Sequence, residues 1–173
     1  MFCLPIRFAM LPIESALFIG WALAVGLSDW RRRLIPNALV LAGGAGALAL
    51  AAARLSPFDI STGAALIGLA AGFVALLPFY FLGMTGAADV KIFAVLGAWC
   101  GPRALVGIWV AASLAAFVHA LVLLARRRAV FALRDLPEQA SLAERRRNST
   151  PYGLLLAAAG LGHLALHALG ARA

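Results

Sequence analysis

Apolar residues along this chain are gathered into six long stretches, and the charged residues fall almost entirely between them. Most stretches approach the ~20 residues that an α-helix needs to cross a bilayer. We therefore predict an all-α integral membrane protein, a single polytopic domain over residues 1–173, with six transmembrane helices at 11–28, 37–53, 62–82, 88–100, 104–125 and 152–169. The fourth and sixth stretches are short for a full span, which predicts little tilt, local thinning of the bilayer or shielding by neighbouring helices.

The composition agrees with a chain that has lipid as its main solvent. Hydrophobic residues make up 64% of the 173 residues and charged residues only 13%, which is too apolar for a soluble domain of this length. The formal net charge of +8 does not indicate a nucleic-acid partner here. Basic loops on membrane proteins face the anionic cytoplasmic leaflet, so the expected partners are membrane lipids.

The distribution of the basic residues predicts the orientation of the chain. With the N-terminus outside, eleven of the 15 Lys and Arg residues fall on the inner side and four on the outer side. The positive-inside rule therefore predicts that both termini lie outside, on the periplasmic face. It also places a basic cytoplasmic loop at 126–151, where Ser141 and Glu144 form a capping-box pattern that predicts a short helix lying on the lipid surface.

Two of the seven acidic residues lie at the inner ends of predicted spans. Asp29 closes the first span and Asp89 opens the fourth, so the predicted topology brings both to one membrane face. Each has a structural interpretation, in which Asp29 pairs with the arginines that follow it and Asp89 caps a helix N-terminus. As a pair they match aspartic-protease chemistry, in which two carboxyl groups share one proton. Helix dipoles favour that proton on Asp29.

Three stretches carry a resemblance to a known family. They are SDWRRRLIPNALVLAG (28–43), GMTGAADVKIFAVLGAWCG (83–101) and TPYGLLLAAAG (150–160). The chain resembles the type IV prepilin peptidases, intramembrane aspartic proteases that have a Gly-x-Gly-Asp signature. The resemblance implies that Asp29 and Asp89 are the catalytic aspartates, supported by an active-site loop that contains Gly83, Gly86, Ala88 and Lys91.

The resemblance also implies a substrate and a location. The family cleaves the basic leader of a prepilin or pseudopilin after a Gly, at the cytoplasmic face of the bacterial inner membrane, without a metal or other cofactor. Larger members carry paired CxxC motifs in an inserted segment and methylate the new N-terminus. This chain has only Cys3 and Cys100, and it is similar to the small peptidase-only branch that serves Flp-type pili of tight-adherence systems. Pilus-assembly proteins are further possible partners of its basic loop.

The signature departs from the family pattern at one position. The chain has Gly86-Ala87-Ala88-Asp89, with Ala88 where the family has Gly. A positive φ there would cost Ala about 1 kcal/mol, whereas a right-handed backbone would accept it, and we expect the latter. Lys91 is predicted either to extend to the interface or to help place the loop. His163 and His167 share a helix face, but we predict no metal site.

Two other functions fit parts of the pattern. A catalytically inactive assembly or scaffold protein with the same fold is suggested by Ala88. A small proton-coupled transporter would use the carboxylates as a relay, but transporters usually show internal repeats and acids near the midplane. Both acids here lie near the membrane face, so the sequence favours the peptidase over the transporter.

Overall fold

The computed structural model describes residues 12–32, 34–131 and 151–170, and every regular element in these ranges is an α-helix. This confirms the predicted all-helical fold. Four of the helices are long and apolar enough to cross a membrane, namely α1, α3, α7 and the Pro102–Ala125 part of α5. The six described helices are α1 (Ile13–Arg32), α2 (Asn37–Ala52), α3 (Thr62–Phe81), α4 (Ala87–Cys100), α5 (Pro102–Phe131) and α7 (Tyr152–Gly170).

Two helix ends lie beyond the positions predicted from hydropathy. Helix α1 continues past Ser28 to Arg32, so Asp29 lies within its last helical turns instead of after it. Helix α5 continues to Phe131, so residues 126–131 are helical and do not belong to the predicted loop. Arg and Ala are strong helix formers, and no Gly or Pro interrupts either extension. The rest of the basic loop, with its predicted surface helix, lies outside the described residues.

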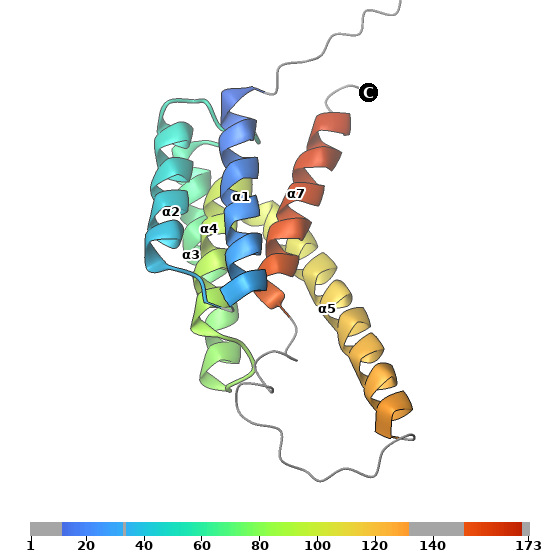
Figure 1. Ribbon diagram of the computed structural model, residues 1–173. Helices are drawn as coiled ribbons and strands as arrows, with labels where there is room; N and C mark the ends of the chain where they lie inside the picture. Colours follow the sequence, from blue (N-terminus) through green and yellow to red (C-terminus); the bar gives the residue numbers. More distant parts are fainter. Residues whose placement is uncertain (1–11, 33, 132–150, 171–173) are drawn as a thin grey trace, which may run out of the picture.

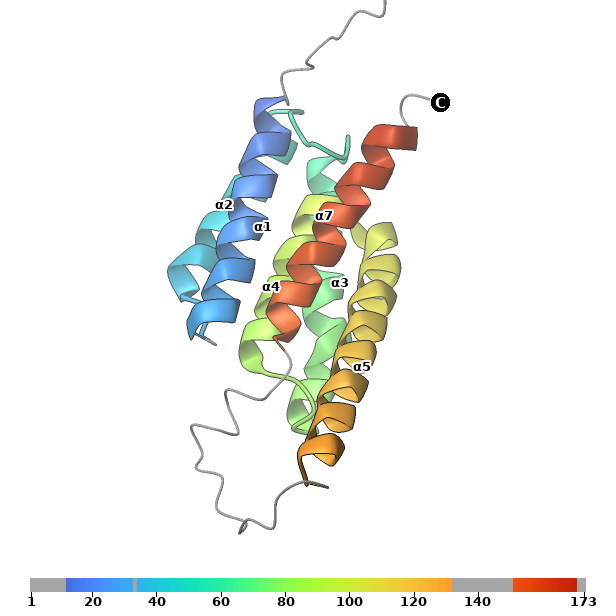
Figure 2. The ribbon, with the colours of Figure 1, turned by 45° about the vertical axis from the view of Figure 1, so that its right-hand side comes forward.

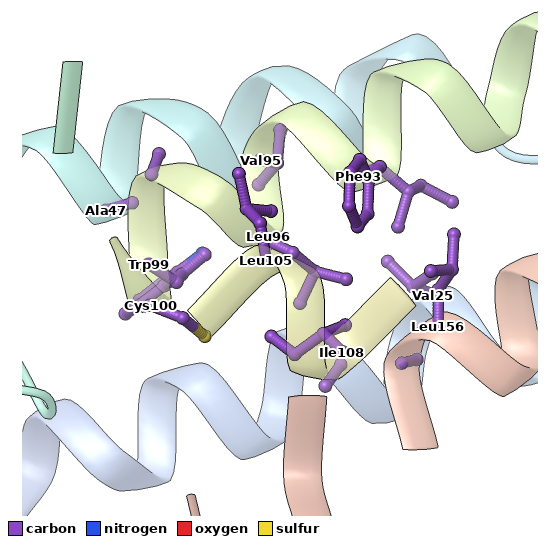
Figure 3. Close-up of a cluster of buried hydrophobic side chains, with 14 of the residues drawn as sticks. Val25, Ala47, Phe93, Val95, Leu96, Trp99, Cys100, Leu105, Ile108 and Leu156 are labelled. Carbon is purple, nitrogen blue, oxygen red and sulfur yellow. The ribbon is translucent and has the colours of Figure 1, made fainter. Parts of the chain in front are cut away.

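Helix α4 lies at the centre of the bundle. It contacts α2, α3, α5 and α7, and its residues from Ile92 to Cys100 are all buried. Figure 3 shows Leu96 and Trp99 of α4 among apolar side chains of the neighbouring helices, including Val25, Ala47 and Leu156. With 14 residues, α4 is about 21 Å long at 1.5 Å per residue, which is shorter than the bilayer core. Its neighbours therefore shield it from lipid, which is one of the three outcomes predicted for a short span.

Glycines bring α3 and α4 into backbone contact. A Cβ at Gly68 would collide with the carbonyl oxygen of Gly97, and a Cβ at Gly72 would lie 2.6 Å from the carbonyl oxygen of Phe93. The small-residue pattern of α3 is therefore a packing surface for α4. Because the two backbones touch at these positions, the contact fixes the axial position of α4 and with it the position of Asp89.

The helices alternate in direction, so that the same end of the bundle collects the C-terminal ends of α1, α3 and α5 and the N-terminal ends of α2, α4 and α7 (Figures 1 and 2). Asp29 and Asp89 both lie at this end, as the sequence predicted. The start of α1 and the end of α7 lie together at the other end. Which end faces the cytoplasm stays a prediction.

Candidate active site

Asp29 caps a helix other than its own. Its side chain is buried, with 8% of its surface exposed, and its Oδ2 accepts a hydrogen bond of 2.9 Å from the backbone N–H of Leu154. Leu154 is the third residue of α7, and Pro151, which precedes that helix, has no side-chain acceptor to offer. The carboxylate of Asp29 thus supplies the capping that the first turn of α7 lacks. It also lies at the positive end of the α7 dipole, which favours a negative charge there.

This contact changes two expectations for Asp29. Asp29 was expected to pair with the arginines that follow it. The described partner of its carboxylate is instead the α7 backbone, and the side chains of Arg31 and Arg32 are exposed. The expected proton on Asp29 follows from the C-terminal end of α1 alone. The structure adds the N-terminus of α7, which acts in the opposite direction and makes a direct hydrogen bond.

Gly153 allows the carboxylate of Asp29 to approach α7. A Cβ at Gly153 would lie 3.1 Å from Oδ2 of Asp29 and 3.0 Å from Cδ1 of Ile35. Both values are closer than ordinary van der Waals contact, so any larger side chain would displace the carboxylate or Ile35. The glycine was visible in the Pro-Tyr-Gly stretch, but its role depends on a contact between helices that the sequence alone does not reveal.

Asp89 is held by the start of its own helix. It is the third residue of α4, and its Oδ2 accepts a hydrogen bond of 3.3 Å from the N–H of Gly86, the N-cap residue. Asp89 therefore contributes to the capping of α4 from the third helical position, whereas the N-cap residue itself is Gly86 and not Asp89 as predicted. At 3.3 Å the bond is longer than the 2.9 Å bond of Asp29, and hydrogen bonds weaken at such distances. The Asp89 side chain is half-buried.

The loop before α4 is shaped by Gly83, whose φ is +71°. The N–H of Gly83 donates to the carbonyl of Tyr80 at 3.0 Å, and that of Met84 donates to the carbonyl of Phe79 at 2.9 Å. These two bonds form a Schellman motif that ends α3, and they require a left-handed residue at Gly83. Ala88, by contrast, lies inside α4 with a right-handed backbone. The departure from the family signature therefore adds no backbone strain.

Lys91 connects the two sequence motifs. Its Nζ donates a hydrogen bond of 2.9 Å to Oδ1 of Asn37, the first residue of α2. The bond holds the N-terminal ends of α2 and α4 together beside the candidate site. This geometry fits the interpretation of Lys91 as a residue that helps place the loop, although its side chain is also exposed.

A cavity of about 460 Å³ adjoins Asp89. Its polar lining comes from Thr85, Asp89, Ser113 and Tyr152, while Asp29 is not among the lining residues. The hydroxyls of Ser113 and Tyr152 lie 3.2 Å apart and share a hydrogen bond across α5 and α7. A larger hollow of about 600 Å³, lined by the loop between α2 and α3, lies at the opposite end of the bundle and contains neither acid of the pair.

The two carboxyl groups approach each other at the first turn of α7, where the N–H of Leu154 donates to Asp29 and Tyr152 lines the cavity beside Asp89. They come from separate motifs and are each held by a backbone N–H at a helix N-terminus. Two such groups, one of which lines a cavity, can share a proton, activate water and polarise a carbonyl.

Comparison with known families identifies the chain. The sequence profile of the type IV leader peptidase family matches residues 16–121, a span that contains both Asp29 and Asp89. This chain belongs to the type IV leader peptidase family. It is therefore a protease of the membrane with a leader-peptidase-like function, and the family implies a prepilin as its substrate. No curated protein and no solved structure matches the chain.

For this leader peptidase, sequence reasoning missed the part of the site that α5 and α7 contribute. Tyr152 and Gly153 follow Pro151 in the third of the family-like stretches. Pro151 has no capping side chain, and this could have indicated that another residue caps the helix that follows. Nothing in the sequence marks Thr85 and Ser113, because a Thr in a loop and a Ser in an apolar helix are ordinary residues at such positions.

The paired histidines of the leader peptidase lie far from these residues in the fold. His163 and His167 both contact the ring of Phe58, with ring centroids 5.3 and 5.6 Å away. Within the described ranges, no group of three His, Cys, Asp or Glu side chains is arranged to hold a metal ion.

Proposed function

We propose that this leader peptidase is an aspartic endopeptidase in which Asp29 and Asp89 form the catalytic pair. Its substrate is a Flp-type prepilin, from which it removes the basic leader after a Gly at the cytoplasmic face of the inner membrane. The observation that carries the proposal is the pairing itself. Two acids from distant motifs lie at one end of the bundle beside the first turn of α7, and one of them lines a cavity.

The proposed reaction uses one ionised and one protonated carboxyl group. The ionised group takes a proton from water, and the hydroxide that forms attacks the carbonyl carbon of the scissile peptide bond. The protonated group donates a hydrogen bond to the carbonyl oxygen, where negative charge develops. Collapse of the tetrahedral intermediate breaks the C–N bond, and the leaving amine takes up a proton from the pair. No cofactor enters this sequence.

The hydrogen bonds suggest how the two roles are divided. Asp29 accepts the shorter bond, from the N-terminus of α7, and its side chain is buried away from the cavity lining. Asp89 accepts the longer bond and lines the cavity. The shorter bond and the start of α7 favour a negative charge on Asp29, whereas Asp89, which lines the cavity, is placed to meet the water and the substrate carbonyl. This reverses the assignment that the dipole of α1 alone favours.

Peptidase activity without methylation is part of the proposal. Helix α1 ends at Arg32 and α2 begins at Asn37, so the connection between the first two helices has no room for an inserted CxxC segment. The two cysteines of the chain are Cys3 and Cys100. Mass spectrometry of processed prepilin, after incubation with S-adenosylmethionine, should show an unmodified N-terminus.

An inactive assembly or scaffold protein is the alternative that Ala88 suggested. Its basis was a strained backbone before Asp89, and the right-handed helical conformation of Ala88 removes that basis. The alternative has no other support in the described residues.

The test is leader cleavage by conservative variants of the two acids. Asp29→Asn and Asp89→Asn keep the side-chain size, and an amide oxygen can still accept the backbone N–H bonds. In lipid vesicles with a prepilin that carries a basic leader, a Gly and an apolar segment, each variant should cleave roughly 10³-fold more slowly or worse. The double variant should be no slower than either single variant, because the two act as one unit.

Asp59→Asn is the matched control. Asp59 lies at the opposite end of the bundle with a φ of 52°, and Asn adopts this left-handed conformation as readily as Asp. The control should cleave at the wild-type rate. Full cleavage by either Asp29→Asn or Asp89→Asn would refute the aspartic mechanism, and absence of cleavage by the wild-type chain would refute the peptidase assignment.

A further inference from the structure

The hydroxyl of Thr85 is buried and has no hydrogen-bond partner in the described part of the chain. Folded proteins leave few polar side-chain atoms in this state, because burial removes the water that would otherwise bond to them. A valine has the same shape and would avoid this cost. Thr85 also gives no capping bond to α4, whose N-cap residue is Gly86. Among the described residues, the fold therefore offers no use for this hydroxyl.

The position of Thr85 suggests a use outside the fold. Thr85 and Asp89 line the same cavity, four residues apart along the chain and on the loop that leads into α4. A substrate whose scissile bond lies against Asp89 would bring its neighbouring peptide groups to Thr85. The main chain of an extended peptide carries donors and acceptors, either of which a hydroxyl can bond.

The cavity continues into an apolar groove between α3 and α5. A second hollow, of about 220 Å³, is lined almost entirely by apolar side chains and shares Leu76, Phe79 and Trp109 with the cavity at Asp89. We call the two together the α3–α5 groove. One of its walls is Val106 of α5, which is 68% exposed on the surface of the bundle. The groove is thus polar at the end that holds Asp89 and apolar along the direction of the spans.

This order of polarity matches the order of a prepilin. The proposed substrate carries its basic leader first, then the scissile bond, and then an apolar helix. If the scissile bond lies at Asp89, the residues that follow it enter the apolar part of the groove, where they replace lipid contacts with protein contacts.

We propose that Thr85 is a substrate-binding residue, whose hydroxyl bonds the prepilin main chain beside the scissile bond while the apolar segment that follows lies in the α3–α5 groove. This inference rests on the proposed peptidase function. In this arrangement Thr85 positions the substrate, and α3 and α5 recognise the apolar segment of the prepilin that remains after cleavage.

The test of Thr85 compares Thr85→Val with Thr85→Ser. Thr85→Val removes the hydroxyl and keeps the shape, so kcat/KM for prepilin should fall roughly threefold to tenfold, the effect of one neutral hydrogen bond. The melting temperature should stay the same or rise, because an unpaired buried hydroxyl has been removed. Thr85→Ser keeps the hydroxyl and should retain most of the wild-type kcat/KM.

The outcomes separate this inference from the proposed function. Wild-type cleavage together with unchanged kcat/KM in Thr85→Val would overturn the role of Thr85 and leave the peptidase intact. A lower melting temperature in Thr85→Val, with an equal loss of kcat/KM in Thr85→Ser, would show that the residue is structural. A wild-type chain that cleaves no prepilin would refute the proposed function, and this inference with it.

A photoreactive residue tests the groove. Benzoylphenylalanine in place of Val106 should crosslink to the apolar segment of prepilin in vesicles. This segment is present in both the intact prepilin and the cleaved product, so the crosslink does not depend on cleavage. The same residue at Leu41 on α2, which is 72% exposed, serves as the control and should label lipid only. Equal prepilin labelling from both positions, or none from Val106 while cleavage proceeds, would overturn the groove assignment.

Discussion

A single methyl group at Gly153 tests whether the contact between Asp29 and α7 matters for cleavage. In Gly153→Ala the new Cβ would lie 3.1 Å from Oδ2 of Asp29 and 3.0 Å from Cδ1 of Ile35, whereas ordinary contact begins at 3.4 Å. The carboxylate must therefore retreat by about 0.3 Å, the difference between 3.4 and 3.1 Å. The hydrogen bond from Leu154, now 2.9 Å, would lengthen to about 3.2 Å, the upper end of the usual range.

The cleavage rate should fall while the free energy of unfolding stays roughly unchanged. A hydrogen bond to a charged group contributes about 1.5–3 kcal/mol. If the displacement removes about 1 kcal/mol of this from the reactive arrangement, the cleavage rate falls about fivefold. Ala is favoured over Gly in a helix by up to about 1 kcal/mol, so the free energy of unfolding should not decrease. Loss of rate without loss of stability is therefore the expected signature of a displaced carboxylate.

Gly162→Ala on the same helix is the control. A Cβ at Gly162 meets nothing within 4 Å, so this variant gains the same helix propensity without touching Asp29. Initial rates of leader cleavage in vesicles and thermal unfolding in detergent would be measured for both variants. Wild-type cleavage by Gly153→Ala would show that the position of the Asp29 carboxylate does not limit the reaction. Equal losses of cleavage rate in both variants would show that the effect comes from changing α7 and not from displacing Asp29.

Three further predictions follow from the same end of the bundle and from the topology. Ala88→Gly should lower stability by no more than about 1 kcal/mol, because Ala88 is helical, and should change the cleavage rate less than about twofold; a tenfold gain would contradict this. Lys91→Met and Asn37→Ala should each slow cleavage by roughly threefold to tenfold, and the double variant should add little, because both remove one hydrogen bond. Reporter fusions after Arg33 should signal from the cytoplasm and those after Asp59 from outside, and reversed signals would contradict the predicted orientation.

Most of the fold could be predicted from hydropathy because lipid restricts the choices. A chain in a bilayer must satisfy its backbone polar groups internally, so each apolar stretch of sufficient length becomes a helix. The helix ends were less accurate, since hydropathy marks where apolar side chains stop and not where backbone hydrogen bonding stops. Helix α1 thus continues through charged residues to Arg32, and α5 continues to Phe131.

The two acids could be found from sequence, but the groups that position them could not. Asp29 and Asp89 stand out because they are the two acidic residues at the inner ends of predicted spans, and alternation of the helices brings them to one end. The bond from Leu154 to Asp29 and the unpartnered hydroxyl of Thr85 depend on how helices far apart in sequence pack. No spacing rule contains that information, because it arises from the distances between helices.

At the proposed site, the contacts that pack the helices also hold the two carboxyl groups. Each carboxylate is held through its Oδ2 by a backbone N–H, Asp29 by the start of α7 and Asp89 by the start of α4. Helix α4 is in turn held in place by the glycine contacts of α3, so the position of Asp89 is set by a rigid backbone and not by a flexible loop. Catalytic groups fixed in this way need little reorganisation as charge develops. The proposed pair is thus preorganised by the same contacts that assemble the bundle around α4.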